Sequence, residues 1–155
     1  MKKRLLNYLK WLKISSLLIL IIFPSCKTES NFDVLAAYFV HTHNRSDLID
    51  VNAIVVIDDK GGCLPCSRNF AKFISIYQTN TTVLFLILAS GTQIDISTYD
   101  KDLENVYFDL TKEFAKTTLL DKSGIIVLDK GTIKALVQIN AENSDEVFNF
   151  IEMSY

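Results

Sequence analysis

Two cysteines separated by two residues constrain this chain more than any other feature. Cys63 and Cys66 follow the apolar, β-branched run Ala53–Asp58 and open the segment Leu64–Tyr77, whose aromatic and aliphatic residues recur every three or four positions. The pair is therefore predicted to lie between a buried strand and the start of a helix. At a helix start, free backbone N–H groups and the helix dipole stabilise a thiolate. A second thiol one turn further in can attack a mixed disulfide formed at the first.

Residues 1–25 have the three parts of a secretory signal. Five positively charged residues and no acidic residue precede the apolar run Ile14–Phe23. The run is followed by Pro24, Ser25 and Cys26. The run is about half the ~20 residues that a membrane-spanning helix needs. Cys26 after the small Ser25 resembles the lipobox of bacterial lipoproteins, which implies that Cys26 becomes the lipidated first residue. Plain secretion and an uncleaved anchor are the alternatives.

Export changes both the charge and the redox setting of the chain. The whole chain carries a net charge of −2, and since residues 1–25 hold five positive charges and no acid, the remainder carries −7. No basic patch interleaves with aromatics, so no nucleic-acid partner is expected. Outside the cytoplasm a structural disulfide is the ordinary use of two thiols. A bridge across two residues closes too short a loop to stabilise much, which favours a redox-active pair over a staple or a metal site.

The rest of the chain alternates between strand-like and helix-like segments. Residues 32–40 fit either a helix or a strand, and a polar break follows at 41–46. Gly131 is expected to take a positive φ in a hairpin turn, and Ser144 is expected to cap the last helix. The remaining expected elements are strands at 81–89, 105–109, 124–128 and 132–139, a partly helical segment at 94–103, and helices at 110–116 and 144–153.

This order of elements resembles the thioredoxin fold. The chain is most similar to the TlpA/ResA type of membrane-tethered extracytoplasmic thioredoxins, over about residues 50–153. The resemblance is carried by Cys63-Leu64-Pro65-Cys66 after a buried strand and by the run 109–115 before an apolar hairpin that ends in 128–133. It implies an α/β fold, a three-layer sandwich with a central mixed sheet that ends in a β-hairpin and a C-terminal helix.

The resemblance also implies a division of the chain and a set of roles. Residues 1–25 would be the lipoprotein signal, 26–48 a lipidated tether and extension, and 49–155 the thioredoxin-like domain. Cys63 would be the attacking nucleophile and Cys66 the resolving thiol, while Leu64 and Pro65 would help to set the reduction potential. The expected function is thiol–disulfide exchange with extracytoplasmic proteins, on a bacterial membrane facing the periplasm. No cofactor is expected, so a redox partner must recharge the pair.

Three positions depart from the family pattern. Ser123 stands where the family places a cis-proline beside the thiol pair, and the Lys122–Ser123 bond is predicted to be trans because a cis bond without proline costs about 2.5–4 kcal/mol. Gly62 replaces a common aromatic residue, and Ile57 replaces the buried acid six residues before the first cysteine. These departures favour the alternative function, a non-enzymatic adaptor lipoprotein with a structural or vestigial disulfide.

A second candidate site is the pair His41 and His43. Imidazoles could bind zinc or copper together with the thiols. Two loop histidines without a metal are the favoured interpretation, and no metal is predicted.

Overall fold

The structure is a computed structural model that describes residues 30–58, 64–77, 79–89 and 103–154, with the backbone alone for 64–68 and 153–154. Its middle layer is one five-stranded sheet in the order β3-β2-β1-β4-β5. β1, β2 and β3 are parallel, β4 is antiparallel to β1, and β5 is antiparallel to β4. The bounds are β1 Ala53–Asp58, β2 Val83–Leu88, β3 Val106–Asp109, β4 Gly124–Asp129 and β5 Thr132–Gln138.

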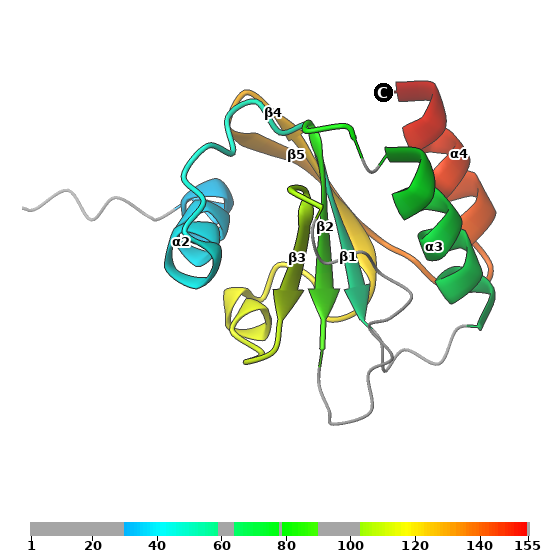
Figure 1. The fold of residues 1–155 in the computed structure, drawn as a ribbon, viewed down its shortest axis with the longest axis horizontal. Coiled ribbons are helices and arrows are strands. Elements are labelled where there is room, and N and C mark those ends of the chain that lie inside the picture. Colours follow the sequence, from blue (N-terminus) through cyan, green and yellow to red (C-terminus); the bar gives the residue numbers. More distant parts are fainter. Residues whose placement is uncertain (1–29, 59–63, 78, 90–102, 155) are drawn as a thin grey trace, which may run out of the picture.

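Helices cover both faces of the sheet. α2 (Asn31–His43) and the 3₁₀ helix η3 (Phe114–Thr117) lie on one side, and α3 (Leu64–Tyr77) and α4 (Ser144–Ser154) lie on the other (Figure 1). This is a three-layer α/β sandwich whose mixed sheet ends in a hairpin and a C-terminal helix. The expected thioredoxin-like fold class is therefore confirmed.

The central strand β1 takes part in both cores. Val55 and Ile57 pack in the core under α3 and α4, whereas Ile54 and Val56 pack in the core under α2 and η3. A strand covered on both faces can be apolar at every position, which explains the unbroken β-branched run in the sequence. β1 has the predicted bounds, as does α3.

The segment that fitted either a helix or a strand is α2, and the helix is longer than expected. Ser30 and Asp33 form a capping box at its start, since each side chain binds the backbone N–H of the other. The helix ends where Asn44 takes the left-handed conformation and donates to the carbonyls of Phe39 and Val40. The expected polar break at 41–46 is thus wrong for His41 and His43, which form the last turn.

The turn after β3 also differs from expectation. A helix was predicted over 110–116, but only Phe114–Thr117 is helical, as a 3₁₀ turn. The Asp109 carboxylate accepts from the backbone N–H groups of Thr111, Glu113 and Phe114. A side chain that binds these groups competes with the backbone bonds of an α-helix and delays its start.

The C-terminal half follows the sequence more closely. Gly131 has φ +75° in the β4–β5 turn, as predicted, and its neighbour Lys130 is also left-handed. α4 begins at Ser144 itself, and because Val147 donates to the carbonyl of Asn143, the capping position falls on Asn143. The predicted segment 94–103 lies almost entirely outside the described residues. No helix among the described ranges is long and apolar enough to cross a membrane.

Asn105 joins the start of β3 to the end of α3. Its side chain is buried, and Nδ2 lies within 3.0–3.1 Å of the carbonyl oxygens of Tyr77, Asn80 and Val83. The Asn105 carbonyl accepts from Phe85 at 2.8 Å. One side chain therefore binds three carbonyls around the loop between α3 and β2. The carbonyls of Tyr77 and Asn80 also accept from the backbone N–H groups of Asn80 and Val83.

We expect Asn105→Ala to lower the free energy of unfolding by about 1–3 kcal/mol, because the hydrogen bonds from Asn105 Nδ2 to three carbonyls are lost. Asn105→Asp should cost more, since a carboxylate places negative charge against the same carbonyls. Urea unfolding followed by circular dichroism measures both. Glu104→Ala, at the exposed neighbouring position, is the control and should change stability by less than about 0.5 kcal/mol. Equal stabilities for all three variants would contradict this role of Asn105.

Candidate functional site

The thiol motif lies between two well-defined elements. β1 ends at Asp58 in the middle of the sheet, and α3 begins at Leu64. Leu64, Pro65 and Cys66 are the first three residues of α3, whose first turn contains no acidic residue. Cys63 lies outside the described residues, as do Cys26 and the side chains of the three residues that open α3. The described backbone thus sets Cys66 in the first turn of a 14-residue helix that follows the central strand.

Ser123 lies beside the end of β1, immediately before β4. Its hydroxyl oxygen accepts from the backbone N–H of Asp58 at 2.9 Å, and its carbonyl accepts from Ile139 at 2.8 Å. The side chain is buried. No cis peptide bond occurs among the described residues, so the Lys122–Ser123 bond is trans, as predicted. At the position where the thioredoxins that the sequence resembles have a proline, this chain thus has a hydroxyl that binds the backbone of Asp58, the last residue of β1.

The glycine after Ser123 lets the hairpin close tightly at this point. A Cβ on Gly124 would lie 2.6 Å from the carbonyl oxygen of Val137 in β5 and 3.0 Å from the Leu120 side chain. Because backbone cannot yield as a flexible side chain can, only glycine fits here. Gly124 therefore keeps Ser123 in register with the end of β1.

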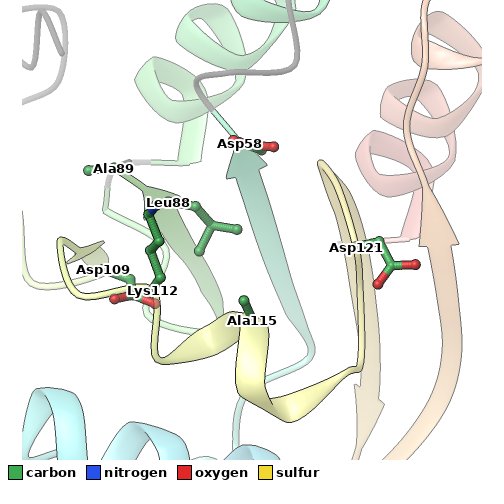
Figure 2. A pocket seen from close by; sticks show the side chains of 7 residues that line it. All are labelled: Asp58, Leu88, Ala89, Asp109, Lys112, Ala115 and Asp121. Atoms are coloured by element: carbon green, nitrogen blue, oxygen red, sulfur yellow. The ribbon is translucent and has the colours of Figure 1, made fainter. Parts of the chain in front are cut away.

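A pocket of about 220 Å³ opens at the carboxyl ends of the three parallel strands (Figure 2). In α/β sheets this edge is where ligands and substrates bind. The Lys112 side chain extends from the turn after β3 toward the end of β2 (Figure 2). Ala115 of η3 also lines the pocket. The lining residues are Asp58, Leu88, Ala89, Asp109, Lys112, Ala115 and Asp121. Three carboxylates against one ammonium make the pocket negative overall.

Asp109 is the buried acid of this edge. Only 1% of it is exposed. Burial alone would raise the pKa of its carboxyl, but the hydrogen bonds from Phe114, Thr111 and Glu113 outweigh burial and hold the pKa below its usual range. Asp109 is therefore a fixed negative charge at neutral pH, and it is not suited to exchange protons with a thiol.

A polar chain runs from Asp109 back to α2. The Tyr38 hydroxyl lies 3.1 Å from Nε2 of His43, and the Asp109 carboxylate acts on the same hydroxyl. Burial first, and then the negative charge of Asp109, raise the pKa of Tyr38, so Tyr38 stays neutral. Burial lowers the pKa of His43, against the attraction of Asp109.

This environment also bears on the two histidines proposed for a metal. His43 is enclosed by the rings of Tyr38, Phe39 and Tyr107, with centroids 5.0–5.5 Å from its own. Within the ranges that the structure describes, no three side chains of metal-ligating type gather. The two histidines sit on a helix rather than in the expected loop, and His43 has a structural hydrogen bond.

No protein-family model matches the chain, and no curated protein sequence matches it. Among solved structures, it is similar to a secreted Mycobacterium tuberculosis disulfide oxidoreductase described as homologous to E. coli DsbE, with TM-score 0.45 and 14% identity over 66% of this chain and 81% of that chain.

Several pocket residues were not identified from the sequence. Asp109 ends a strand that was itself predicted, and Thr111 follows two residues later, which is the spacing of a side-chain-capped turn. Together with the rule that sites form at carboxyl ends of parallel strands, that spacing could have identified Asp109. Asp58, at the end of β1, is half-buried and lines the pocket. Lys112 and Asp121 carry no sequence signal, because only the packing of η3 brings them to this edge.

Ser123→Ala should release the end of β1. The Asp58 N–H would lose its acceptor, which costs about 1 kcal/mol. We expect faster hydrogen exchange at the Asp58 amide, measured by NMR, with little change in the middle of β1. Ser75→Ala, on the exposed surface of α3, is the matched control. Unchanged hydrogen exchange at the Asp58 amide would contradict the role of the Ser123 hydroxyl at the end of β1.

His43 should make stability depend on pH in mild acid. Because burial lowers its pKa in the folded chain, the unfolded chain binds the proton first as the pH falls through about 6.5. The free energy of unfolding is therefore highest above that pH, where His43 is neutral in both states, and it falls as the pH drops below it. His43→Gln keeps a donor for Tyr38 but does not titrate, so its unfolding free energy should change less between pH 7.5 and 5.5. His41→Gln, exposed on the same helix, should behave like the wild type in urea titrations.

Proposed function

We propose that this chain is a thiol–disulfide oxidoreductase of the TlpA/ResA type that acts on extracytoplasmic proteins through Cys63 and Cys66. The observation that carries the proposal is the position of the motif. Cys63 follows the end of the central strand by five residues, and Leu64, Pro65 and Cys66 are the first residues of a 14-residue helix. The absence of acidic residues from that first turn leaves the helix dipole uncancelled. A thiolate at this position is stabilised, which is the requirement for attack on a disulfide.

The proposed exchange has two steps. The Cys63 thiolate attacks one sulfur of a substrate disulfide, which forms a mixed disulfide and expels the other substrate sulfur as a thiolate. The Cys66 thiolate then attacks the Cys63 sulfur, which releases the second substrate thiolate and leaves a Cys63–Cys66 disulfide. The substrate gains two electrons and the chain loses two. A dithiol partner must reduce the pair again, and the reverse cycle, which oxidises substrates, needs a disulfide partner instead.

The surroundings support slow or selective exchange rather than general reduction. Ile57, in place of the family's buried acid, is 3% exposed within the apolar core and offers no proton acceptor. Asp109, the buried acid of the same sheet edge, has a lowered pKa and is occupied by four hydrogen bonds. The resolving thiol would therefore lose its proton to water or to the partner. Leu64 and Pro65, between the cysteines, would set the potential through the geometry of the first turn.

Localisation and attachment belong to the same proposal. The chain would be exported by residues 1–25 and anchored by lipid at Cys26, facing the periplasm, with 26–48 as tether and extension and 49–155 as the thioredoxin-like domain. The partners would be disulfide-bearing or dithiol proteins and a recharging redox protein.

An adaptor without redox turnover is the second candidate. The buried Ile57 and the trans Ser123 favour it, because both remove features that the family uses for exchange. In that case the pair would form a stable disulfide, and the negative pocket at the sheet edge would serve protein contacts.

The thiol–disulfide equilibrium of the pair separates the two candidates. We expect a reversible transition across glutathione buffers at a potential above roughly −300 mV, as exchange-competent disulfides show. Alkylation followed by mass measurement counts the free thiols at each buffer ratio. A pair that stays oxidised across the whole range would favour the adaptor.

Trapping variants test the direction of attack. Cys66→Ser should accumulate mixed disulfides on Cys63, because the resolving thiol is missing, whereas Cys63→Ser is the matched control and should accumulate few. Gel mobility with and without reductant measures both after acid quenching of whole cells. Equal trapping by the two variants would contradict the assignment of Cys63 as nucleophile.

A further inference from the structure

The chain between the proposed lipid site and the domain is very short. Cys26 and Ser30 are four residues apart, and a fully extended chain spans at most about 3.6 Å per residue. The first described residue, Ser30, therefore lies within about 14 Å of a lipidated Cys26. Ser30 is also fixed, because it is the N-cap of α2 and shares a capping box with Asp33. The place of the α2 N-terminus in the fold thus decides which part of the domain is next to the bilayer.

That place is the end of the sheet where β4 turns into β5. A methyl group placed on Gly131 in this turn would lie 3.4 Å from the ring of Phe32, in the first turn of α2, and 3.8 Å from Ile49. Ile49 is 62% exposed, and Lys130 is exposed beside it. We name Phe32, Ile49, Lys130 and Gly131 the anchor-end surface. An exposed aliphatic residue and a lysine are groups that suit a lipid headgroup region.

The thiol motif lies at the other end of the sheet. β4 is antiparallel to β1, and Leu128 donates to the Asn52 carbonyl, so the β4–β5 turn adjoins the start of β1. In Figure 1 the arrowheads of β1, β2 and β3 point away from that turn. At about 3.3 Å per residue, β1 separates its two ends by about 17 Å. Cys63 comes five residues after the far end.

Both ends of the sheet carry carboxylates, so charge does not distinguish them. The far end holds the pocket lined by Asp58, Asp109 and Asp121 with one lysine. At the anchor end, Asp33, Asp50 and Asp129 are exposed beside Phe32, Ile49 and Lys130. The short tether therefore determines the orientation.

We infer that the lipid-anchored domain rests with its anchor-end surface against the bilayer and presents the thiol end to the aqueous phase. The inference rests on the lipid attachment included in the proposed function. Its consequence is that redox partners reach the pair from the aqueous side, as soluble proteins or water-exposed domains. A partner whose thiols lie within the membrane plane would face the wrong end of the sheet.

Tryptophan quenching in vesicles tests this orientation. The chain has one tryptophan, Trp11, within the proposed signal, so a Trp11→Phe background removes other emission. Two exposed aliphatic residues form a matched pair: Ile49 at the anchor end, 62% exposed, and Leu110 after β3 at the thiol end, 68% exposed. The full-length protein, purified from membranes with its anchor, is reconstituted into phosphatidylcholine–phosphatidylglycerol vesicles with plain or brominated chains.

We expect brominated lipid to reduce the emission of Ile49→Trp by about twofold, since apolar interfacial groups enter the boundary between headgroups and acyl chains by about 5–10 Å, and to leave Leu110→Trp nearly unchanged. Equal quenching of the two variants, or stronger quenching of Leu110→Trp, would overturn the orientation. Thr132→Trp and Lys122→Trp, exposed at the same two ends, repeat the comparison if the first pair misfolds.

A chain that does not float with the vesicles has no anchor, and the inference fails with it. The glutathione titration, run on the same preparation, reports separately on the dithiol. Loss of redox exchange with asymmetric quenching would refute the oxidoreductase alone, and exchange with symmetric quenching would refute the orientation alone.

Discussion

The burial of β1 on both faces is the constraint on which the rest of this structure depends. An apolar strand of six residues that pairs with β2 on one edge and β4 on the other must be covered above and below. α3 and α4 cover one face, and α2 with η3 covers the other. Because β1 and β2 are parallel, the helix α3 has to cross between them, and the thiol motif opens that crossing.

Polar groups that the two apolar cores exclude lie at the edge of the sheet formed by the carboxyl ends of β1, β2 and β3. Ser123 holds the backbone of Asp58, and Asp109 organises the turn that leads into η3. Both fix backbone N–H groups that would otherwise be unpaired at the end of a strand. Hydrogen bonds to side chains therefore fix the backbone at the end of β1 and after β3.

The polar chain His43–Tyr38–Asp109 links this edge to α2. It places a titratable ring among aromatic neighbours on the helix that begins next to the proposed anchor. The same helix thus contributes Phe32 to the anchor-end surface, and its Tyr38 lies near Asp109, which lines the negative pocket. A change in the position of α2 would therefore move Phe32 at one end of the sheet and Tyr38 at the other.

The sequence by itself determined the bounds of β1 and α3, the hairpin with Gly131, and the position of Cys66 in the first turn of the helix that follows the central strand. These features are local: a β-branched run, a three-to-four residue period and a turn glycine each report their own structure. Only the tertiary structure decided that 31–43 is a helix, that residues 110–113 are held in a turn, and which acids line the pocket. Segment 32–40 is apolar in both patterns, and the Asp109 turn and the pocket depend on residues from separate strands that meet only when the sheet is assembled.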